Sequence, residues 1–229
     1  MKLGERLTAV ASLIPKNTVM ADIGTDHAYL PIYLLKSNII RSAVAGEVNK
    51  GPYHAAKETI EYYGAVNDVS LRLGDGLDVI RPNEVDVVVI AGMGGGTIVD
   101  ILEKSPETAK SLQQIILQPM NASATLRKWL VENGWFIADE LLVKEDERLY
   151  EIISAKQGKQ IEIEPILFDI GPVLWSSRSV LLKEHIENLI LQAKRILKEM
   201  DASEQAKKSE KYQQYAQKIR ELEMKLECL

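Results

Sequence analysis

Short apolar runs alternate with helical segments over residues 18 to 155, and this alternation is the strongest constraint on the fold. The runs have the length and the Val and Ile content of buried strands: VMADI (19–23), SAVAGEV (42–48), SLRL (70–73), VDVVVIA (85–91) and QIILQ (114–118). The helical segments between them cover residues 31–37, 51–63, 97–104 and 122–132. This order predicts an α/β chain with parallel strands and right-handed crossovers.

The segment WFIADELLVKEDERLYEIISAK (135–156) breaks the alternation. It contains two apolar stretches joined by the charged turn KEDER, with no helix between them. Two such stretches predict an antiparallel hairpin, which would complete a doubly wound sheet of about seven strands.

From residue 180 onward the chain contains neither Gly nor Pro and has no strand pattern. Apolar side chains fall at 186, 190, 193, 197 and 200, and then at 212, 215, 219, 222, 226 and 229. Alternating spacings of three and four are typical of the seam between paired helices. Residues 201–203 (Asp-Ala-Ser) are expected to end one helix and cap the next. We therefore predict a sheet domain over residues 1–160 and an α-helical hairpin domain over residues 161–229.

The predicted strands end in a set of acids and glycines. Asp22 and Gly24 end the first strand, Glu47 ends the second, and GDG (74–76) and AGMGGG (91–96) follow the third and fourth. Each motif alone is weak, because Asp and Gly also form simple turns. Ligands of open α/β sheets bind outside the carboxyl ends of the strands, so four such ends together predict a nucleotide site. An acid at position 47 suits ribose hydroxyls.

The loop after the first strand restricts the kind of nucleotide. The chain has no GxxxxGK[ST] motif, which excludes a P-loop nucleotidase. A dehydrogenase would cradle a pyrophosphate on this loop, but Asp26 would repel its two charges. The same carboxylate would favour a cationic ligand without phosphate. The loop therefore favours S-adenosylmethionine, which carries a sulfonium and an ammonium, with a nicotinamide oxidoreductase as the rival.

Composition excludes several other classes. No apolar run reaches the length of a membrane span, and MKLGERLTAVASLIP has charges that indicate an amphipathic helix rather than a signal peptide. One cysteine (Cys228) and three scattered histidines predict no disulfide framework and no metal site, so a cytoplasmic protein is expected. The net charge is −5, but the stretch from Arg178 to Arg220 carries ten Lys and Arg against six Asp and Glu.

Several motifs together resemble one known family. ADIGTDHAYLPIYL, AGEVNKGP, RLGDGL, IAGMGG, IILQP and LYEII stand in the order and spacing of the bacterial tRNA methyltransferases that modify N1 of adenine 22. The resemblance covers the whole chain. It implies a Rossmann-like seven-stranded class I methyltransferase domain, a C-terminal coiled-coil domain, S-adenosylmethionine as methyl donor and tRNA as acceptor. One position departs from the family: Met120 follows Pro119 where an asparagine is usual, and Asn121 comes one place later.

The resemblance also implies roles for individual residues. Asp22 and Gly24 shape the cofactor turn, and Asp26 and His27 border the amino-acid end of the cofactor. Glu47 is expected to hold the ribose hydroxyls. Asp75 is expected to accept a hydrogen bond from the adenine amino group. Gly92 and Met93 are expected to line the floor near the sulfonium. The remaining expected cofactor residues adjoin Glu47 and Asp75: Val48, Gly74 and Gly76.

Two residues of the loop are candidates for catalysis. Methylated adenine is cationic until a proton leaves its exocyclic amine, and Asp26 is the carboxylate expected to stabilise that charge and accept the proton. Tyr29 is a candidate for stacking on the target base; the alternative for a tyrosine at a helix start is packing into the core. N1 lies on the pairing edge, so the base must be unpaired or flipped.

The helical domain is expected to contact tRNA phosphates through its cations, although exposed lysines commonly form only a solvated helix face. The candidates are Lys183, Lys194, Arg195, Lys198, Lys207 and Lys208. A monomer is expected. A nicotinamide oxidoreductase and a non-catalytic RNA-binding protein are the alternative functions.

Overall fold

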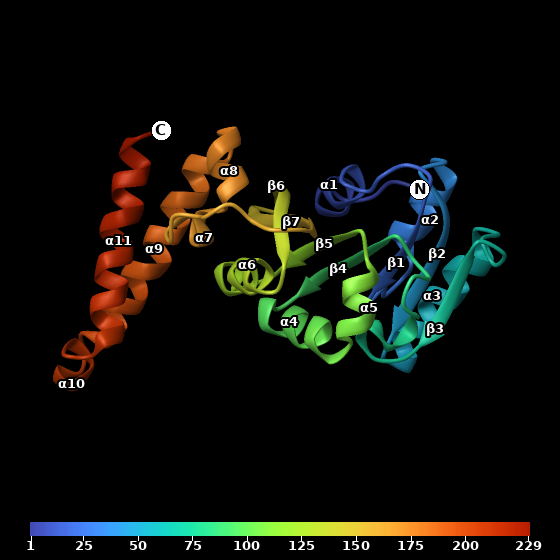
Figure 1. Ribbon diagram of the computed structural model, residues 1–229, viewed down its shortest axis with the longest axis horizontal. Coiled ribbons are helices and arrows are strands. Elements are labelled where there is room, and N and C mark those ends of the chain that lie inside the picture. Colours follow the sequence, from blue (N-terminus) through green and yellow to red (C-terminus); the bar gives the residue numbers. More distant parts are fainter. The chain divides into compact units, whose positions relative to one another are not determined.

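The computed structural model describes all residues from Met1 to Leu229, and these form two compact units, Met1–Ile161 and Glu162–Leu229 (Figure 1). The first unit contains every strand of the protein and the first six helices. The second unit is entirely helical.

The first unit is built on one seven-stranded sheet with the order β3-β2-β1-β4-β5-β7-β6. Its strands are β1 (Thr18–Ile23), β2 (Ile40–Glu47), β3 (Val69–Leu73), β4 (Val87–Met93), β5 (Gln114–Pro119), β6 (Trp135–Glu145) and β7 (Arg148–Gln157). The first five strands pair in parallel, whereas β7 pairs antiparallel with both β5 and β6. The predicted parallel sheet closed by an antiparallel hairpin is therefore confirmed.

The strand order places β7 between β5 and β6. The first strand of the hairpin, β6, therefore forms the edge of the sheet, and the second strand, β7, pairs with β5. Its tip is a tight turn in which Asp146 and Glu147 both have left-handed backbone conformations (φ 47° and 61°). Two successive left-handed residues give the turn a twist that matches the twist of paired strands. The predicted charged turn is therefore confirmed.

Six helices flank this sheet. They are α1 (Glu5–Ser12), α2 (Tyr29–Lys36), α3 (Lys50–Tyr62), α4 (Gly95–Lys104), α5 (Pro106–Ser111) and α6 (Ser123–Glu132), with a short 3-10 helix at Gly76–Val79. The predicted N-terminal amphipathic helix corresponds to α1. The sequence pattern missed α5 and the 3-10 helix, because each spans only about one turn and has no apolar periodicity to detect.

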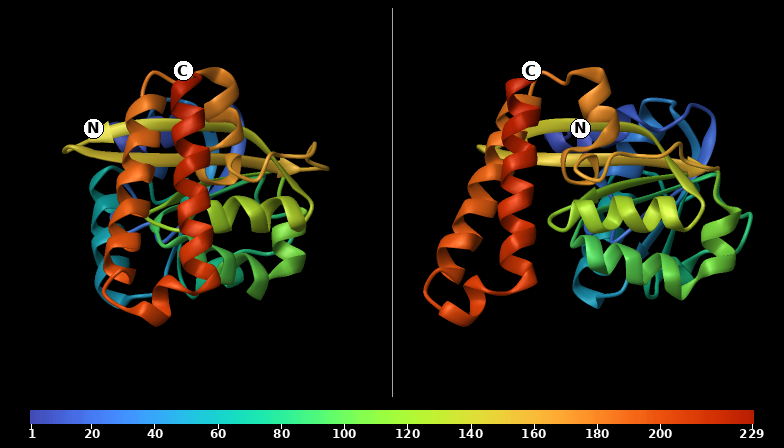
Figure 2. Two further views of the ribbon diagram at one scale, coloured as in Figure 1. Left: turned by 90° about the vertical axis from the view of Figure 1, so that its left-hand side faces the viewer. Right: turned by 60° about the vertical axis from the view of Figure 1, so that its left-hand side comes forward.

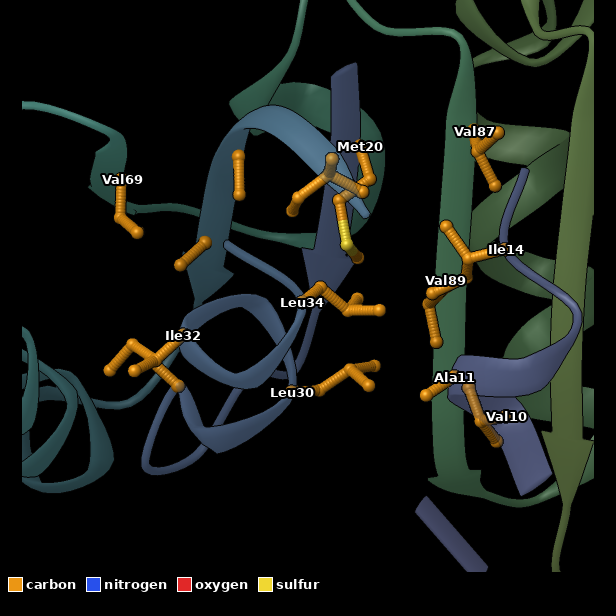
Figure 3. Close-up of a cluster of buried hydrophobic side chains, with 14 of the residues drawn as sticks. Val10, Ala11, Ile14, Met20, Leu30, Ile32, Leu34, Val69, Val87 and Val89 are labelled. Carbon is orange, nitrogen blue, oxygen red and sulfur yellow. The ribbon is translucent and has the colours of Figure 1, made fainter. Parts of the chain in front are cut away.

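Helices α1, α2 and α3 share one apolar cluster with one face of the sheet. Figure 3 shows Val10, Ala11 and Ile14 of the N-terminal segment beside Val87 and Val89 of β4, with Leu30 and Leu34 of α2 nearby. All of these side chains are at least nine-tenths buried. Burial of each large aliphatic side chain contributes roughly 1.5–3 kcal/mol relative to exposure, so this cluster fixes α1 and α2 against the strands.

A buried ion-pair network attaches α6 to the hairpin. Arg127 is fully buried, and its Nε donates to Glu140 Oε1 at 2.6 Å while Nη2 donates to Glu151 Oε2 at 2.5 Å. Ser123 Oγ donates to the other oxygen of Glu151 at 2.8 Å. Because both carboxylates and the guanidinium satisfy one another, the network can be buried without an orphaned charge.

The second unit contains α7 (Leu167–Ile170), α8 (Pro172–Ser177), α9 (Leu182–Met200), α10 (Glu204–Lys207) and α11 (Glu210–Glu227). The two long helices α9 and α11 lie side by side (Figure 2) and are joined by an ion pair between Lys194 and Glu223 at 2.6 Å. Ile186, Ile190, Ile219 and Leu222 of the predicted seam are buried.

Two details of the helical unit differ from the sequence-based expectation. Ser203 caps only the short α10, accepting a hydrogen bond from Ala206 N, whereas Ser209 caps α11 by accepting from Tyr212 N. Leu229, the last predicted seam position, lies beyond the end of α11 and is exposed. No helix is both long and apolar enough to cross a bilayer.

Candidate functional site

A cavity of about 630 Å³ opens at the carboxyl ends of the parallel strands of the first unit. This cavity is lined by all twelve residues that were predicted from the sequence to bind the cofactor or to act in catalysis. They are Asp22, Gly24, Asp26, His27, Tyr29, Glu47, Val48, Gly74, Asp75, Gly76, Gly92 and Met93. Parallel pairing brings these strand ends to one edge, which explains why segments 70 residues apart share one site.

The loop after β1 has an unusual backbone. Asp26 (φ 52°) and Ala28 (φ 55°) both adopt the left-handed conformation on either side of His27. Aspartate tolerates this conformation better than most residues, whereas alanine is strained in it. Ala28 is fully buried, and its apolar surroundings hold the conformation. The side chain of Asp26, in contrast, is 68% exposed and lines the cavity.

The rings of His27 and Tyr29 lie parallel beside this turn. Their centroids are 5.3 Å apart with 12° between the ring planes. Tyr29 is 43% exposed, so the alternative interpretation of this residue as a core tyrosine is wrong. A half-exposed stacked pair offers a flat aromatic surface, which suits a planar ligand such as a nucleobase.

Asp22 forms the buried floor of the site. Thr25 Oγ1 donates to its Oδ2 at 2.6 Å. The pKa of Asp22 is raised from 3.8 to about 6, mainly by burial; the Thr25 hydrogen bond opposes this rise, and the nearby Glu47 carboxylate adds to it. A carboxylate that is desolvated in this way is stabilised in its charged form by a cation placed beside it.

Glu47 is buried and rigidly held. Its Oε1 accepts from the backbone N–H groups of Val48 and Asn49, both at 2.9 Å. These bonds fix the carboxylate and leave Oε2 without a donor in the protein, so that it can accept a hydrogen bond from a hydroxyl group in the cavity.

Asp75 is held by a partner outside the cavity. Lys104 Nζ on α4 donates to Asp75 Oδ2 at 2.7 Å, and the same ammonium lies 3.2 Å from Asp78 Oδ2. The carboxylate of Asp75 is therefore shared between the cavity and Lys104. The predicted bond from Asp75 to an adenine amino group has to use the oxygen that Lys104 does not engage.

Three glycines around the site occupy positions where a Cβ would collide with a neighbouring atom. A Cβ on Gly24 (φ 75°) would lie 2.3 Å from Met93 Cε, and one on Gly74 would lie 2.7 Å from Val79 Cγ1. A Cβ on Gly95 would lie 2.8 Å from the backbone oxygens of Asn121 and Ala122. The last contact is with the main chain, so α4 can begin beside the β5–α6 loop only because residue 95 is glycine.

The segment that departs from the family pattern lies beside this contact. Met120 N donates to Met93 O at 2.8 Å, and Met120 is exposed. The side chain of Asn121 lies against Gly94, with Oδ1 3.2 Å from the position that a Cβ would occupy there. Neither residue lines the cavity. No group of three or more His, Cys, Asp and Glu side chains is placed to hold a metal ion.

Comparisons with known proteins place this site in a family. The family described as methyltransferase domain matches residues 3–153. The curated tRNA (adenine(22)-N(1))-methyltransferase of Bacillus subtilis strain 168 is 42% identical over 158 residues, 69% of this chain and 66% of that protein. The crystal structure of the B. subtilis m1A22 tRNA methyltransferase TrmK has a TM-score of 0.88 at 33% identity, covering 98% of this chain and 99% of that chain. This chain belongs to the family of bacterial tRNA (adenine-22 N1)-methyltransferases.

A further solved structure, Streptococcus pneumoniae Sp1610 in complex with S-adenosyl-L-methionine, has a TM-score of 0.86 at 32% identity and covers 96% of this chain and 98% of that chain. The alignment with the curated B. subtilis protein spans just under two thirds of that protein's length. The resemblance that the motifs predicted is therefore confirmed at the level of the family.

Sequence reasoning missed several residues that line the cavity of this family member. They are Arg6, Leu7, Ile23, Thr25, Leu30, Gly46, Asn49, Pro52, Ala91, Thr97 and Ile101. Most adjoin a predicted residue and could have been found by extending each motif. Arg6 could not, because it belongs to α1 and reaches the cavity only through the tertiary packing of that helix.

The six cations predicted to contact tRNA all belong to the helical unit. Three of them already have acidic partners: Lys194 with Glu223, Arg195 with Glu199 and Lys207 with Glu204. The other three, Lys183, Lys198 and Lys208, are exposed and form no ion pair. Glu162–Leu229 as a whole carries eleven Lys and Arg against twelve Asp and Glu. The excess of Lys and Arg over Asp and Glu is therefore confined to the stretch from Arg178 to Arg220 and does not extend over the whole unit.

We expect replacement of Glu47 by glutamine to weaken S-adenosylmethionine binding about tenfold to a hundredfold. Glutamine keeps an oxygen for the N–H groups of Val48 and Asn49, but the ribose hydroxyls lose a charged acceptor worth roughly 1.5–3 kcal/mol. Isothermal titration calorimetry measures the change. Glu58→Gln, an exposed substitution on α3, is the control, and equal losses in the two variants would contradict the assignment.

Proposed function

We propose that this protein transfers a methyl group from S-adenosylmethionine to N1 of adenine 22 in tRNA. The single observation that carries the proposal is a cavity with four carboxylates at the strand ends and no phosphate-binding loop, in a chain that belongs to this family. The names of its relatives supply the acceptor and the position. Neither an oxidoreductase nor a non-catalytic RNA-binding protein is favoured by any feature of the site.

The chain's own groups fit the cofactor. Glu47 accepts from the ribose hydroxyls, and Asp75 accepts from the adenine amino group. Asp22 places a buried negative charge beside the cationic portion. Gly24 and Gly92, both with left-handed backbones, add no side chain of their own at the ends of β1 and β4. When bound, the cofactor supplies an electrophilic methyl group on a sulfonium.

The residues at the cavity mouth are suited to the target base. The parallel rings of His27 and Tyr29 provide a surface on which a flipped adenine can stack, which compensates part of the few kcal/mol that unstacking costs. The exposed carboxylate of Asp26 lies in the same loop, with Oδ1 3.7 Å from His27 Nε2. We assign to Asp26 the stabilisation of the positive charge that develops on adenine and the removal of a proton from its exocyclic amine.

The helical unit is proposed to hold the body of the tRNA. Lys183, Lys198 and Lys208 are the strongest of the six candidates, because their charges are not neutralised within the protein. We further propose that the enzyme acts as a monomer in the cytoplasm and needs no metal, since alignment of N1, methyl carbon and sulfur supplies most of the catalysis.

The direct test is transfer of labelled methyl from S-adenosylmethionine to bacterial tRNA, followed by nucleoside analysis. We expect 1-methyladenosine, and we expect no product with a tRNA transcript that has guanine at position 22. Stoichiometric tRNA binding without methyl transfer would favour the non-catalytic alternative. An absorbance change of NADH on addition of the protein would favour the oxidoreductase.

A chain ending at Ile161 separates the two proposed roles. Because every cavity residue precedes this point, the truncated protein should bind S-adenosylmethionine as tightly as the full chain. It should lose most tRNA affinity, and the dependence of the remaining affinity on salt should become shallower, because fewer phosphate contacts release counterions. Parallel titrations with cofactor and with tRNA measure both effects. Undiminished tRNA binding by the folded truncation would move the RNA surface to the sheet unit.

A further inference from the structure

The loop between β5 and α6 (residues 120–122) is bonded through its main chain to the segment that follows β4. Met120 N donates to Met93 O at 2.8 Å. Gly95 N donates to Asn121 O at 3.1 Å. Met93 lines the cavity, and α4 begins at Gly95. The position of the β5–α6 loop therefore determines where the chain runs as it leaves the cavity and enters α4.

This loop contains a residue in a conformation that its side chain does not favour. Ala122, directly before the first turn of α6, has a left-handed backbone with φ 52° and ψ 33°. Alanine is strained in this region, because its Cβ approaches the main chain too closely. Unlike the buried Ala28, Ala122 is exposed, so apolar packing does not hold it in place. Such strain persists only where neighbouring bonds determine the conformation.

One of these bonds comes from the hairpin. Ser123 directly follows Ala122, is 9% exposed, and donates through Oγ to Glu151 Oε1 of β7 at 2.8 Å. A serine at a helix start commonly bonds to the main chain of its own helix, but this hydroxyl bonds to another element. Glu151 is a fixed acceptor, because its Oε2 accepts from the fully buried Arg127 at 2.5 Å. The residue next to strained Ala122 is thus tied to the sheet.

The neighbouring residue of the cavity is held independently of this loop. Gly92 N donates to Gln118 Oε1 at 3.1 Å, and Gln118 is a fully buried residue of β5. Glu47, the proposed ribose ligand, ends β2, which is separated from β4 by β1. Loss of the Ser123 bond should therefore displace the chain from Met93 onward and leave the cofactor-binding residues in place.

We propose that Glu151, acting through Ser123, positions the β5–α6 loop and with it the start of α4 for methyl transfer. This inference rests on the proposed function, which supplies the reaction. Neither Glu151 nor Ser123 lines the cavity, so both are positioning residues. Transfer requires alignment of N1, methyl carbon and sulfur, which a small displacement of the surrounding chain disturbs. Buried ion pairs commonly add little stability over apolar residues, so placement of the loop is the stronger reason for this network.

The first test is Ser123→Ala, which removes one hydroxyl and leaves the rest of the network intact. We expect the single-turnover rate of methyl transfer at saturating cofactor to fall about tenfold, because Ala122 is no longer held in its left-handed conformation. The affinity for S-adenosylmethionine, measured by calorimetry, should stay within about twofold of wild type, because Gly92 and Glu47 keep their own bonds. A thermal melt confirms that the variant is folded at the assay temperature.

A second substitution separates positioning from support of the fold. Glycine adopts the left-handed conformation without strain, so Ala122→Gly added to Ser123→Ala should recover most of the lost rate. It restores no bond to the hairpin, so a role of Ser123 in stability alone predicts no recovery. Glu151→Gln added to Ser123→Ala should lower the rate little further, because Glu151 acts through the hydroxyl that is already absent.

The control is Trp129→Phe, which removes another bond of α6, from Trp129 Nε1 to Glu103 Oε1 at 2.6 Å, and should keep the wild-type rate. A wild-type rate in Ser123→Ala would overturn the proposal. So would a lost rate that Ala122→Gly does not restore, or a further large loss on adding Glu151→Gln. A loss of cofactor affinity that accounts for the whole loss of rate would also overturn it. Absence of methyl transfer by the wild-type protein would instead reject the proposed function.

Discussion

Asp26→Asn should lower the single-turnover rate of methyl transfer about a hundredfold, the lower end of the range for a general acid or base, because its carboxylate is exposed. Asparagine has nearly the same size as aspartate and also tolerates the left-handed backbone of residue 26, so the loop should keep its shape. The affinity for tRNA should change little, because the substitution removes one charge at the reacting base.

Rapid-quench measurement with enzyme in excess over tRNA gives this rate directly. The matched control is Asp68→Asn, an exposed aspartate before β3 that does not line the cavity. A variant that transfers methyl at the wild-type rate but binds S-adenosylmethionine weakly would show that Asp26 is a cofactor ligand. The acid–base role would then be wrong.

Local sequence patterns were sufficient to predict the parallel strands and the position of the site at their ends. The Val and Ile runs predicted all five parallel strands, because a strand buried on both faces must be apolar along its length. The motifs at the strand ends predicted one site, because parallel strands bring their carboxyl ends to a single edge. His27 and Tyr29 entered the prediction as members of that loop, but their stacking was visible only in the structure.

The features that depend on long-range packing could not be predicted from the sequence. No periodicity in the sequence indicates that β7 inserts between β5 and β6, because both strands of a hairpin carry the same alternation. Arg127 looks like a charge on the exposed face of a helix until Glu140 and Glu151 of the hairpin meet it in the core. The pairing of Asp75 with Lys104 and the reach of Arg6 into the cavity likewise depend on helices packing in three dimensions.

The predicted tRNA surface shows that a count of charges along the sequence has a limit of its own. Counting charges over Arg178 to Arg220 favoured a basic tail, but three of the six nominated cations pair with acids one helical turn away or on the facing helix. A charge count cannot separate a cation that is available to a phosphate from one that a glutamate already neutralises.

Asp22→Asn should make the ligand-free protein more stable at neutral pH and at the same time greatly weaken its affinity for S-adenosylmethionine. Burial raises the pKa of Asp22 from 3.8 to about 6, so the folded protein prefers the protonated form. This preference contributes fully to the stability of the folded state below pH 3.8, and its contribution is lost as the pH rises through about 6. At pH 7 the ionised carboxylate then costs the folded state about 3 kcal/mol at most. Asparagine keeps an acceptor for Thr25 Oγ1 without this cost.

Thermal melts of the two proteins from pH 4 to pH 8 should therefore coincide at the acid end and separate as the pH rises, with the variant melting higher at pH 7. At pH 7 the wild-type protein should bind the cofactor more tightly than the variant, although it melts at a lower temperature. In the wild-type protein it should rise with pH through about 6, because ionised Asp22 attracts the cationic cofactor, whereas in Asp22→Asn it should be weak and nearly independent of pH. Asp68→Asn should follow the wild-type profiles. A variant that melts below wild type at pH 7 and still binds the cofactor with the wild-type pH profile would show that Asp22 serves the fold rather than the ligand.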